Sequence, residues 1–202
     1  MKKSGIFLMP RREFIASASY LAIGGHLFGI SPFSSQSAQA PPELKKQLTP
    51  EELEFVKESI MAKDMKNYFI IKRYSCAESL LMVSLRFLGK QEELVWIASG
   101  FGGGLYHKDL CGLLTSGVMA IGLSSGMLKK ERLEGKEICQ QKLNQYWEWW
   151  TSIAPLHCSE IKKEGTSSEE DPEYKVCRRL GQLAAAKIEE LIRPVRLASS
   201  KV

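Results

Sequence analysis

The chain has 202 residues, of which 44% are hydrophobic, and its formal net charge is +5. This length and apolar content suffice for one sizeable core and favour a single domain. The first 40 residues carry four basic side chains and one acidic one, so about +2 remains on the rest of the chain. A near-neutral body without a Lys/Arg-rich run excludes a nucleic-acid partner.

Residues 1–40 have the pattern of a cleaved export signal. A basic start precedes an apolar stretch from Phe14 to Ile30, and small residues lead to a cleavage pattern that ends at Ala40. The pair Arg11-Arg12 resembles the twin-arginine signal, whose known substrates cross the membrane already folded. We therefore expect the twin-arginine export machinery as a partner and a periplasmic or other extracytoplasmic location after cleavage near Ala40.

Two alternatives remain for this segment. It can be an ordinary secretion signal in which the two arginines are adjacent by chance. It can also stay in place as a membrane anchor, although its apolar stretch is short for a span and is interrupted by Gly24, Gly25 and His26.

The mature chain begins with a polar linker over residues 41–48, followed by one helical domain over residues 49–202. Thr49 and Glu52 form a capping box with Pro50 at the first helical position, which predicts a helix to about Asn67. The β-leaning patch at residues 68–71 is too short for a sheet. Ser75 caps a second helix over residues 75–89, and a short third one covers residues 91–99.

The central helix is predicted over residues 110–128, a run of nineteen uncharged residues with Asp109 as its N-cap. The length is near that of a membrane span, but four glycines and four Ser or Thr residues dilute the hydrophobicity. We expect a buried core helix and no stable membrane span in the mature protein.

Two further helices complete the predicted fold. In the first, over residues 137–153, Tyr146, Trp147 and Trp150 share the apolar face, whereas Trp149 points elsewhere as an exposed contact. After an exposed loop over residues 162–171, the last helix begins near Pro172 and ends at Pro194. The sequence predicts an all-α fold, an irregular bundle of five to six helices with a glycine-rich interhelical loop.

All five cysteines lie in the mature part and are widely spaced along it. The spacing excludes C-x-x-C redox pairs, zinc knuckles and the C-x-x-C-H attachment of haem, so no c-type haem is expected. Any shared site must be assembled by the fold. Each cysteine can instead be a small buried hydrophobe, but several in an exported protein should pair or coordinate something.

Cys111 and the glycines before it are the most informative stretch. With Asp109 as N-cap, Cys111 lies in the first helical turn, where the helix dipole favours a thiolate. Gly102, Gly103 and Gly104 can turn their amides inward as an anion-accepting nest, as around many iron–sulfur sites. The alternative is a tight interhelical turn whose glycines permit close packing.

The segments 75–78, 100–104, 111–112 and 119–123 together resemble the redox-active-protein family named for its C_GCAxxG_C_C cysteine pattern, over about residues 74–188. Redox activity is itself a prediction for most members of that family. The resemblance implies a redox or iron–sulfur site formed by Cys76, Cys111, Cys158 and Cys177, with Cys139 as an extra. Leu113 and Ser116 depart from the Ala and Gly that the family commonly has there. Relatives include the split-Soret cytochromes, which carry c-type haem.

We expect an exported electron-transfer protein with a cysteine-bound iron–sulfur cluster and a redox partner protein of unknown identity. The alternatives are a thiol–disulfide switch and a helical binding domain stapled by disulfides. His107 and His157 can replace thiolates as ligands, or can be ordinary loop histidines. No Ser-His-Asp order or carboxylate pair stands out, so the sequence leaves open whether the protein is an enzyme.

Overall fold

The computed structural model describes residues 42–72, 74–129, 131–162 and 172–199. The chain divides after Ala40 into two units, and the described residues all belong to the second, Pro41–Val202. The predicted export signal over residues 1–40 and most of the predicted loop over residues 162–171 therefore lie outside the described residues.

The described residues are helical, which confirms the all-α prediction, with more helices than the expected five to six. No strand occurs among them, and Leu110 and His157 form an isolated antiparallel bridge. The short elements are α2 (Pro50–Lys57), α3 (Ile60–Lys66), η1 (Asn67–Ile71), η2 (Glu92–Phe101), η3 (Gly104–Lys108) and α7 (Cys158–Ile161). The longer helices are α4 (Cys76–Phe87), α5 (Gly112–Leu128), α6 (Arg132–Ile153) and α8 (Pro172–Ser199).

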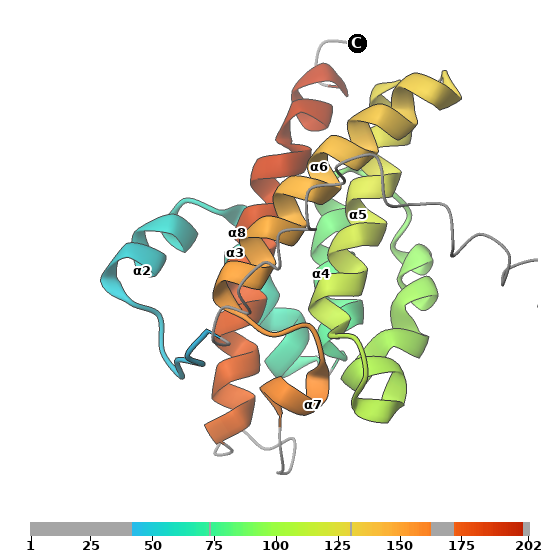
Figure 1. Ribbon diagram of the computed structural model, residues 1–202. Helices are drawn as coiled ribbons and strands as arrows, with labels where there is room; N and C mark the ends of the chain where they lie inside the picture. The colour runs from blue at the N-terminus through green and yellow to red at the C-terminus, as the bar shows by residue number, and fades with distance from the viewer. Residues whose placement is uncertain (1–41, 73, 130, 163–171, 200–202) are drawn as a thin grey trace, which may run out of the picture. The chain divides into compact units, whose positions relative to one another are not determined.

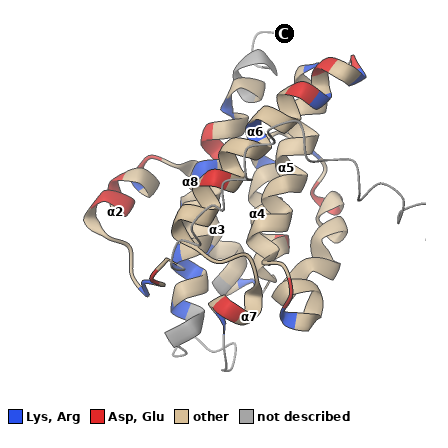
Figure 2. Ribbon diagram, in the orientation of Figure 1, with Lys and Arg blue, Asp and Glu red and all other residues tan. Residues whose placement is uncertain are grey.

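Helices α4, α5 and α8 contact one another and form the centre of this unit (Figure 1). Around them, α3 packs on α8, η2 packs on α4, and α6 packs on α5. The ribbon of α5 carries no charged residue (Figure 2), as its sequence predicts for a core helix. No helix in the described part of the chain combines the length and apolar character needed to cross a membrane.

Local capping places the first helices. The Thr49 hydroxyl accepts the Glu52 N–H and the Glu52 carboxylate accepts the Thr49 N–H, so α2 starts where the capping box predicts. The predicted continuation to Asn67 is wrong, because the helix breaks before Ser59. The Ser59 hydroxyl caps α3 and donates to the buried Glu189 carboxylate at 2.7 Å, so a contact with α8 ends α2 early.

Helix α6 corrects the expected exposure of two tryptophans and begins at Arg132, five residues before the predicted start. Trp147 is 48% exposed, whereas Trp149 is partly buried and packs on the core. The Trp149 ring stacks on that of Tyr146, with centroids 5.7 Å apart. This stacking against a fully buried ring selects Trp149 for the interior.

Helix α8 continues through Pro194, which corrects the predicted end at that proline. An internal proline costs a helix about 3 kcal/mol. Val195, directly after it, is buried in the core, and this burial helps to offset the cost. Near the other end of α8, the buried Arg179 binds the Glu52 carboxylate through Nε and Nη2, which fastens α2 to α8.

Candidate functional site

Cys76 is the first residue of α4, directly after the capping residue Ser75. Ser75 caps the helix as predicted, and its hydroxyl and the Glu78 carboxylate form a capping box; Glu78 also accepts a 2.6 Å hydrogen bond from the Ser99 hydroxyl of η2. The start of α4 is therefore fixed both by its own cap and by the neighbouring element. This fixes the position from which the Cys76 side chain projects.

Gly112 brings the starts of α4 and α5 together. A Cβ atom at Gly112 would lie 2.7 Å from Cys76 Sγ and 2.8 Å from the Phe101 carbonyl oxygen. Real side chains do not tolerate such distances, so only glycine allows the Cys76 sulfur to reach the α5 backbone. The glycine after Cys111 thus has a packing role beside a predicted site residue.

Cys111 is itself the N-cap of α5, which corrects the prediction that Asp109 holds this position. Two backbone bonds around the Leu110–His157 bridge explain the later start. Cys111 N–H donates to the Leu156 carbonyl at 2.8 Å, and Cys158 N–H donates to the Asp109 carbonyl at 2.7 Å. The bridge keeps residues 109–111 extended and brings Cys111 and Cys158 onto neighbouring segments.

The glycine loop packs against Cys158, the first residue of α7. A Cβ atom at Gly104 would lie 2.7 Å from Cys158 Cβ and 2.5 Å from the Asp109 carbonyl oxygen, and the φ of Gly104 is +68°. Gly103, at φ +59°, directs its N–H toward Cys76, where it favours the thiolate. One of the three amides of the expected nest therefore favours the thiolate of Cys76.

The four family cysteines influence one another electrostatically: Cys158 acts on Cys76, and Cys76 and Cys177 act on Cys111. A negative charge on Cys158 raises the pKa of Cys76, and negative charges on Cys76 and on Cys177 of α8 raise the pKa of Cys111. Segments as far apart as α4 and α8 thus supply thiols to one region of the core. Cys139 is separate from this group: it lies on α6, where its charged neighbour is Lys142.

Burial is the largest influence on the pKa of Cys76, Cys111 and Cys158. It raises the pKa of Cys76 and Cys158, and it raises that of Cys111 far above the ordinary range of a thiol. The N–H groups of Leu113 and Leu114 oppose this at Cys111, but they are weaker than burial. The helix start therefore favours the Cys111 thiolate as predicted, but burial of a side chain that is only 5% exposed outweighs this effect on the pKa.

Two lysines near Cys158 were not anticipated from the sequence. The charges of Lys162 and Lys108 oppose the effect of burial on the Cys158 pKa. Lys162 caps α7 four residues after Cys158 and is therefore a local neighbour, whereas Lys108 at the end of η3 is brought to the same thiol only by the fold. Tyr146 lies near Cys111 and was also not anticipated. Its hydroxyl donates to the Leu113 carbonyl at 3.1 Å. Burial is the main cause that raises the pKa of Tyr146, and a negative charge on Cys111 raises it further.

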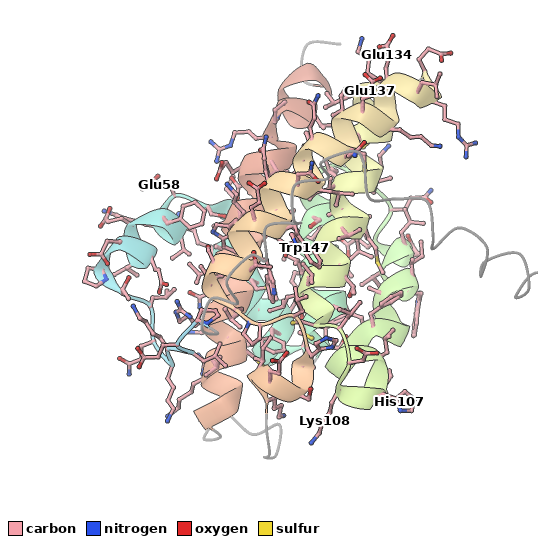
Figure 3. All side chains as sticks on the ribbon, in the orientation of Figure 1. Glu58, His107, Lys108, Glu134, Glu137 and Trp147 are labelled. Carbon is pink, nitrogen blue, oxygen red and sulfur yellow. The ribbon has the colours of Figure 1, made fainter. Side chains whose placement is uncertain are left out.

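The histidines take different positions. His157 Nδ1 lies 2.9 Å from the Asp109 carboxylate, so it supports the bridge that joins α5 to α7. His107 lies at the outer edge of η3 and points away from the helices (Figure 3). In the described part of the chain, no group of three or more His, Cys, Asp or Glu side chains forms a cage for a metal ion.

All five cysteines lie in the described residues, and no disulfide joins any two of them there. The candidate site therefore consists of four thiols at the starts of α4, α5 and α7 and along α8, of which Cys111 and Cys158 are buried and Cys76 and Cys177 are partly buried.

Comparison with protein families identifies the chain at this point. Residues 74–191, more than half of the chain, match the family described as "Putative redox-active protein (C_GCAxxG_C_C)". The chain belongs to this family. The match contains Cys76, Cys111, Cys158 and Cys177, and it also spans Cys139. No curated protein and no solved structure matched the chain.

Proposed function

We propose that this protein is an exported electron-transfer protein that holds an iron–sulfur cluster through Cys76, Cys111, Cys158 and Cys177. The observation that supports the proposal is the electrostatic coupling that links Cys158 to Cys76, and Cys76 and Cys177 to Cys111, although these thiols come from α7, α4, α8 and α5. Four cysteines are the common ligand set of iron–sulfur clusters. When bound, the cluster would supply a centre that accepts and donates one electron.

The donor set fits a cluster better than it fits a single ion. A single zinc ion draws its ligands to about 2.3 Å, and the described residues form no cage of this kind. An iron–sulfur cluster contains several atoms and keeps its thiolates farther apart than a single ion does. Such spacing agrees with four thiols that affect one another's pKa without forming a tight cage.

The raised pKa values also favour a bound cation. Three buried thiols that resist ionisation gain most from metal binding, because a metal deprotonates its coordinating thiol and compensates the charge that burial disfavours. The same burial makes these thiols poor nucleophiles while they are protonated, which disfavours rapid thiol–disulfide exchange.

The surrounding backbone has a defined role in this proposal. The Gly103 N–H is aimed at Cys76 and would donate to its thiolate, while Gly102 and Gly104 allow the loop to lie against Ser75 and Cys158. Hydrogen bonds to ligand sulfurs and exclusion of water set the potential of such a centre. Here the chain's own groups tune the potential and orient the ligands.

Export through the twin-arginine machinery, with signal cleavage near Ala40 and a periplasmic site of action, is part of the same proposal. It rests on the sequence of residues 1–40. Export of an already folded chain is suited to a protein that must acquire a cluster before it crosses the membrane. The redox partner is a separate protein.

Anaerobic purification of the full chain tests the cluster. We expect visible absorption together with iron and sulfide in equal amounts. Cys111→Ser and Cys158→Ser should lose most of the iron, whereas the matched control Cys139→Ser should keep it. A folded, colourless wild-type chain without iron or sulfide would refute the proposal.

A thiol–disulfide switch is the second candidate, favoured by the proximity of Cys76 to both Cys111 and Cys158. Oxidation would join two sulfurs and release two protons and two electrons to a disulfide or quinone acceptor. Thiol counting after denaturation separates the candidates. A switch loses two thiols reversibly without metal release, and a domain stapled by two disulfides would retain a single thiol.

A further inference from the structure

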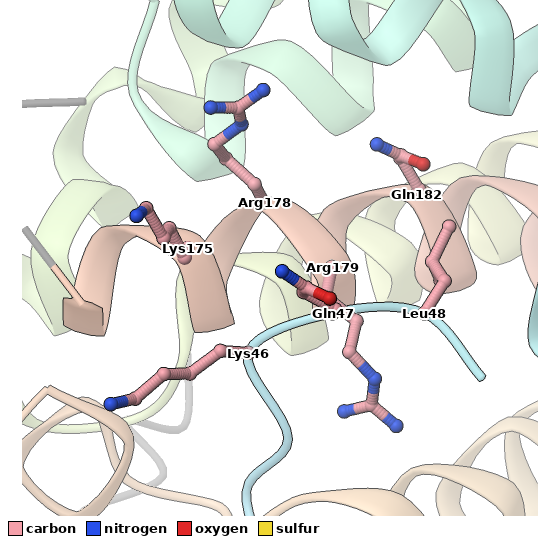
Figure 4. Close-up of a pocket in the computed structure, with 7 residues that line it drawn as sticks. All are labelled: Lys46, Gln47, Leu48, Lys175, Arg178, Arg179 and Gln182. Atoms are coloured by element: carbon pink, nitrogen blue, oxygen red, sulfur yellow. The ribbon is translucent and has the colours of Figure 1, made fainter. Parts of the chain in front are cut away.

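A basic cavity lies between the segment before α2 and the first turns of α8; none of the four family cysteines lines it, although Lys175 and Arg178 flank Cys177 along α8. Its volume is about 300 Å³, and four of its lining residues are cationic: Lys46, Lys175, Arg178 and Arg179. Figure 4 shows Lys46 and Lys175 extending toward the same side, while Arg178 and Arg179 leave α8 in two other directions. The cations therefore surround the cavity from several sides.

The charge around this cavity is largely uncompensated. Arg179 is paired with Glu52, but Lys46, Lys175 and Arg178 have no carboxylate partner among the described residues. Basic positions also stand out on the early turns of α8 and on the segment before α2 in Figure 2. Cations held near one another repel, so an anion among them lowers the electrostatic energy.

Arg179 adds a second and independent observation. Its side chain is 4% exposed, and its Nε and Nη2 groups donate to Glu52. Its Nη1 group is buried and has no hydrogen-bond partner. A buried charged donor without an acceptor is costly, and the planar guanidinium is well suited to phosphate oxygens. Arg179, one of the lining residues, thus carries a buried donor that has no acceptor among the described residues.

We propose that this cavity binds a phosphate-bearing ligand through Lys46, Lys175 and Arg178, with the buried Arg179 guanidinium in its lining adding positive charge. A monocarboxylate supplies one negative charge against three uncompensated cations, whereas a phosphate or diphosphate group supplies more. The positive end of the α8 dipole, a few residues before Lys175, favours the same anion. The ligand is either a soluble phosphorylated molecule or a phospholipid headgroup, and the site does not depend on the redox proposal.

Calorimetric titration of the full chain at low ionic strength tests the site, with diphosphate and inorganic phosphate as soluble probes. Vesicles of phosphatidylglycerol, compared with phosphatidylcholine vesicles, test the headgroup. We expect saturable binding of one diphosphate, or binding to the anionic vesicles, weakened at least tenfold in Lys175→Gln/Arg178→Gln. Arg179 is kept, because it also holds Glu52.

The matched control is Arg132→Gln/Lys136→Gln, which removes the same charge from the start of α6, outside the cavity. Its affinity should stay within twofold of the wild type, and circular dichroism should show that both double variants are folded. Binding of diphosphate or phosphate would indicate a soluble phosphorylated ligand, and binding of the anionic vesicles would indicate a phospholipid headgroup. Equal weakening in the two variants, or no saturable binding to any probe, would overturn the proposal.

Discussion

Replacing Gly112 with alanine tests directly whether the cysteine site depends on close contact between α4 and α5. The new Cβ atom would lie 2.7 Å from Cys76 Sγ, 2.8 Å from the Phe101 carbonyl oxygen and 3.1 Å from Ala77 Cβ. Two of these contacts are with groups that cannot rotate away, namely a backbone carbonyl and a Cβ atom. The start of α5 must therefore move away from α4.

The matched control is Gly122→Ala in the same helix, where a Cβ atom has no neighbour within 4 Å. Alanine stabilises a helix interior by about 0.5–1 kcal/mol relative to glycine, so Gly122→Ala should raise the free energy of unfolding by that amount. Gly112, as the first residue of α5, gains less from alanine. It also bears an overpacking cost of about 1–3 kcal/mol. The two variants should therefore differ by about 1–4 kcal/mol.

Urea unfolding followed by circular dichroism measures this difference, since both variants expose nearly the same surface and should share one m-value. If the proposed cluster is bound, Gly112→Ala should also release iron more readily than Gly122→Ala, because its clash involves the sulfur of a proposed ligand, Cys76. If Gly112→Ala proves as stable as Gly122→Ala, the close approach of Cys76 to α5 is wrong.

Three further predictions concern the buried polar groups and the thiols. Glu52→Gln should destabilise the fold by about 3–5 kcal/mol, because it leaves Arg179 buried without its partner. The Arg179 hydrogen bond lowers the pKa of Glu52 in the folded chain. The stability that the pair contributes is therefore present above the ordinary carboxylate pKa and is lost as pH falls through the lowered value. In acid, the free energy of unfolding should depend less steeply on pH for Glu52→Gln than for the wild type, and parallel curves would contradict this. Tyr146→Phe should cost about 0.5–1.5 kcal/mol by removing the bond to Leu113, whereas Tyr106→Phe, at a 72% exposed position, should change nothing; equal unfolding midpoints in urea would argue against the buried bond. In the metal-free folded chain, Cys111 and Cys158 should react slowly with a thiol reagent at pH 8 and faster as the pH rises, because burial raises the pKa of both thiols. Cys111→Ser should remove part of this slow reaction. If the two thiols react as fast as they do in the denatured chain, they are not buried.

The outcomes along the chain separate local from long-range causes. The caps at Thr49 and Ser75 depend on residues three positions apart, so the sequence is sufficient to predict them. The break before Ser59 depends on Glu189, which is 130 residues away. Cys111 replaces Asp109 as N-cap because of a bridge to residues 156–158, and no local pattern reveals that bridge.

The tryptophans of α6 show why periodicity alone is insufficient. At 3.6 residues per turn, Trp147 and Trp149 lie about 80° to either side of the centre of the apolar face. The pattern treats them as equivalent, and the prediction chose the wrong one. Contacts with Tyr146 and with neighbouring helices decide which side is covered, and these contacts exist only in the folded chain.

By itself, the sequence determined the helical class, the caps, the buried central helix and the family cysteines, since each follows from composition, short spacing or a motif. Only the tertiary structure decided that electrostatic coupling links four of the five cysteines, that the Gly103 N–H favours the Cys76 thiolate, and that burial raises the pKa of Cys76, Cys111 and Cys158. The reason is physical: helix periodicity fixes a residue's direction around its own axis, whereas the meeting of two helices and the loss of water between them depend on every element that packs there.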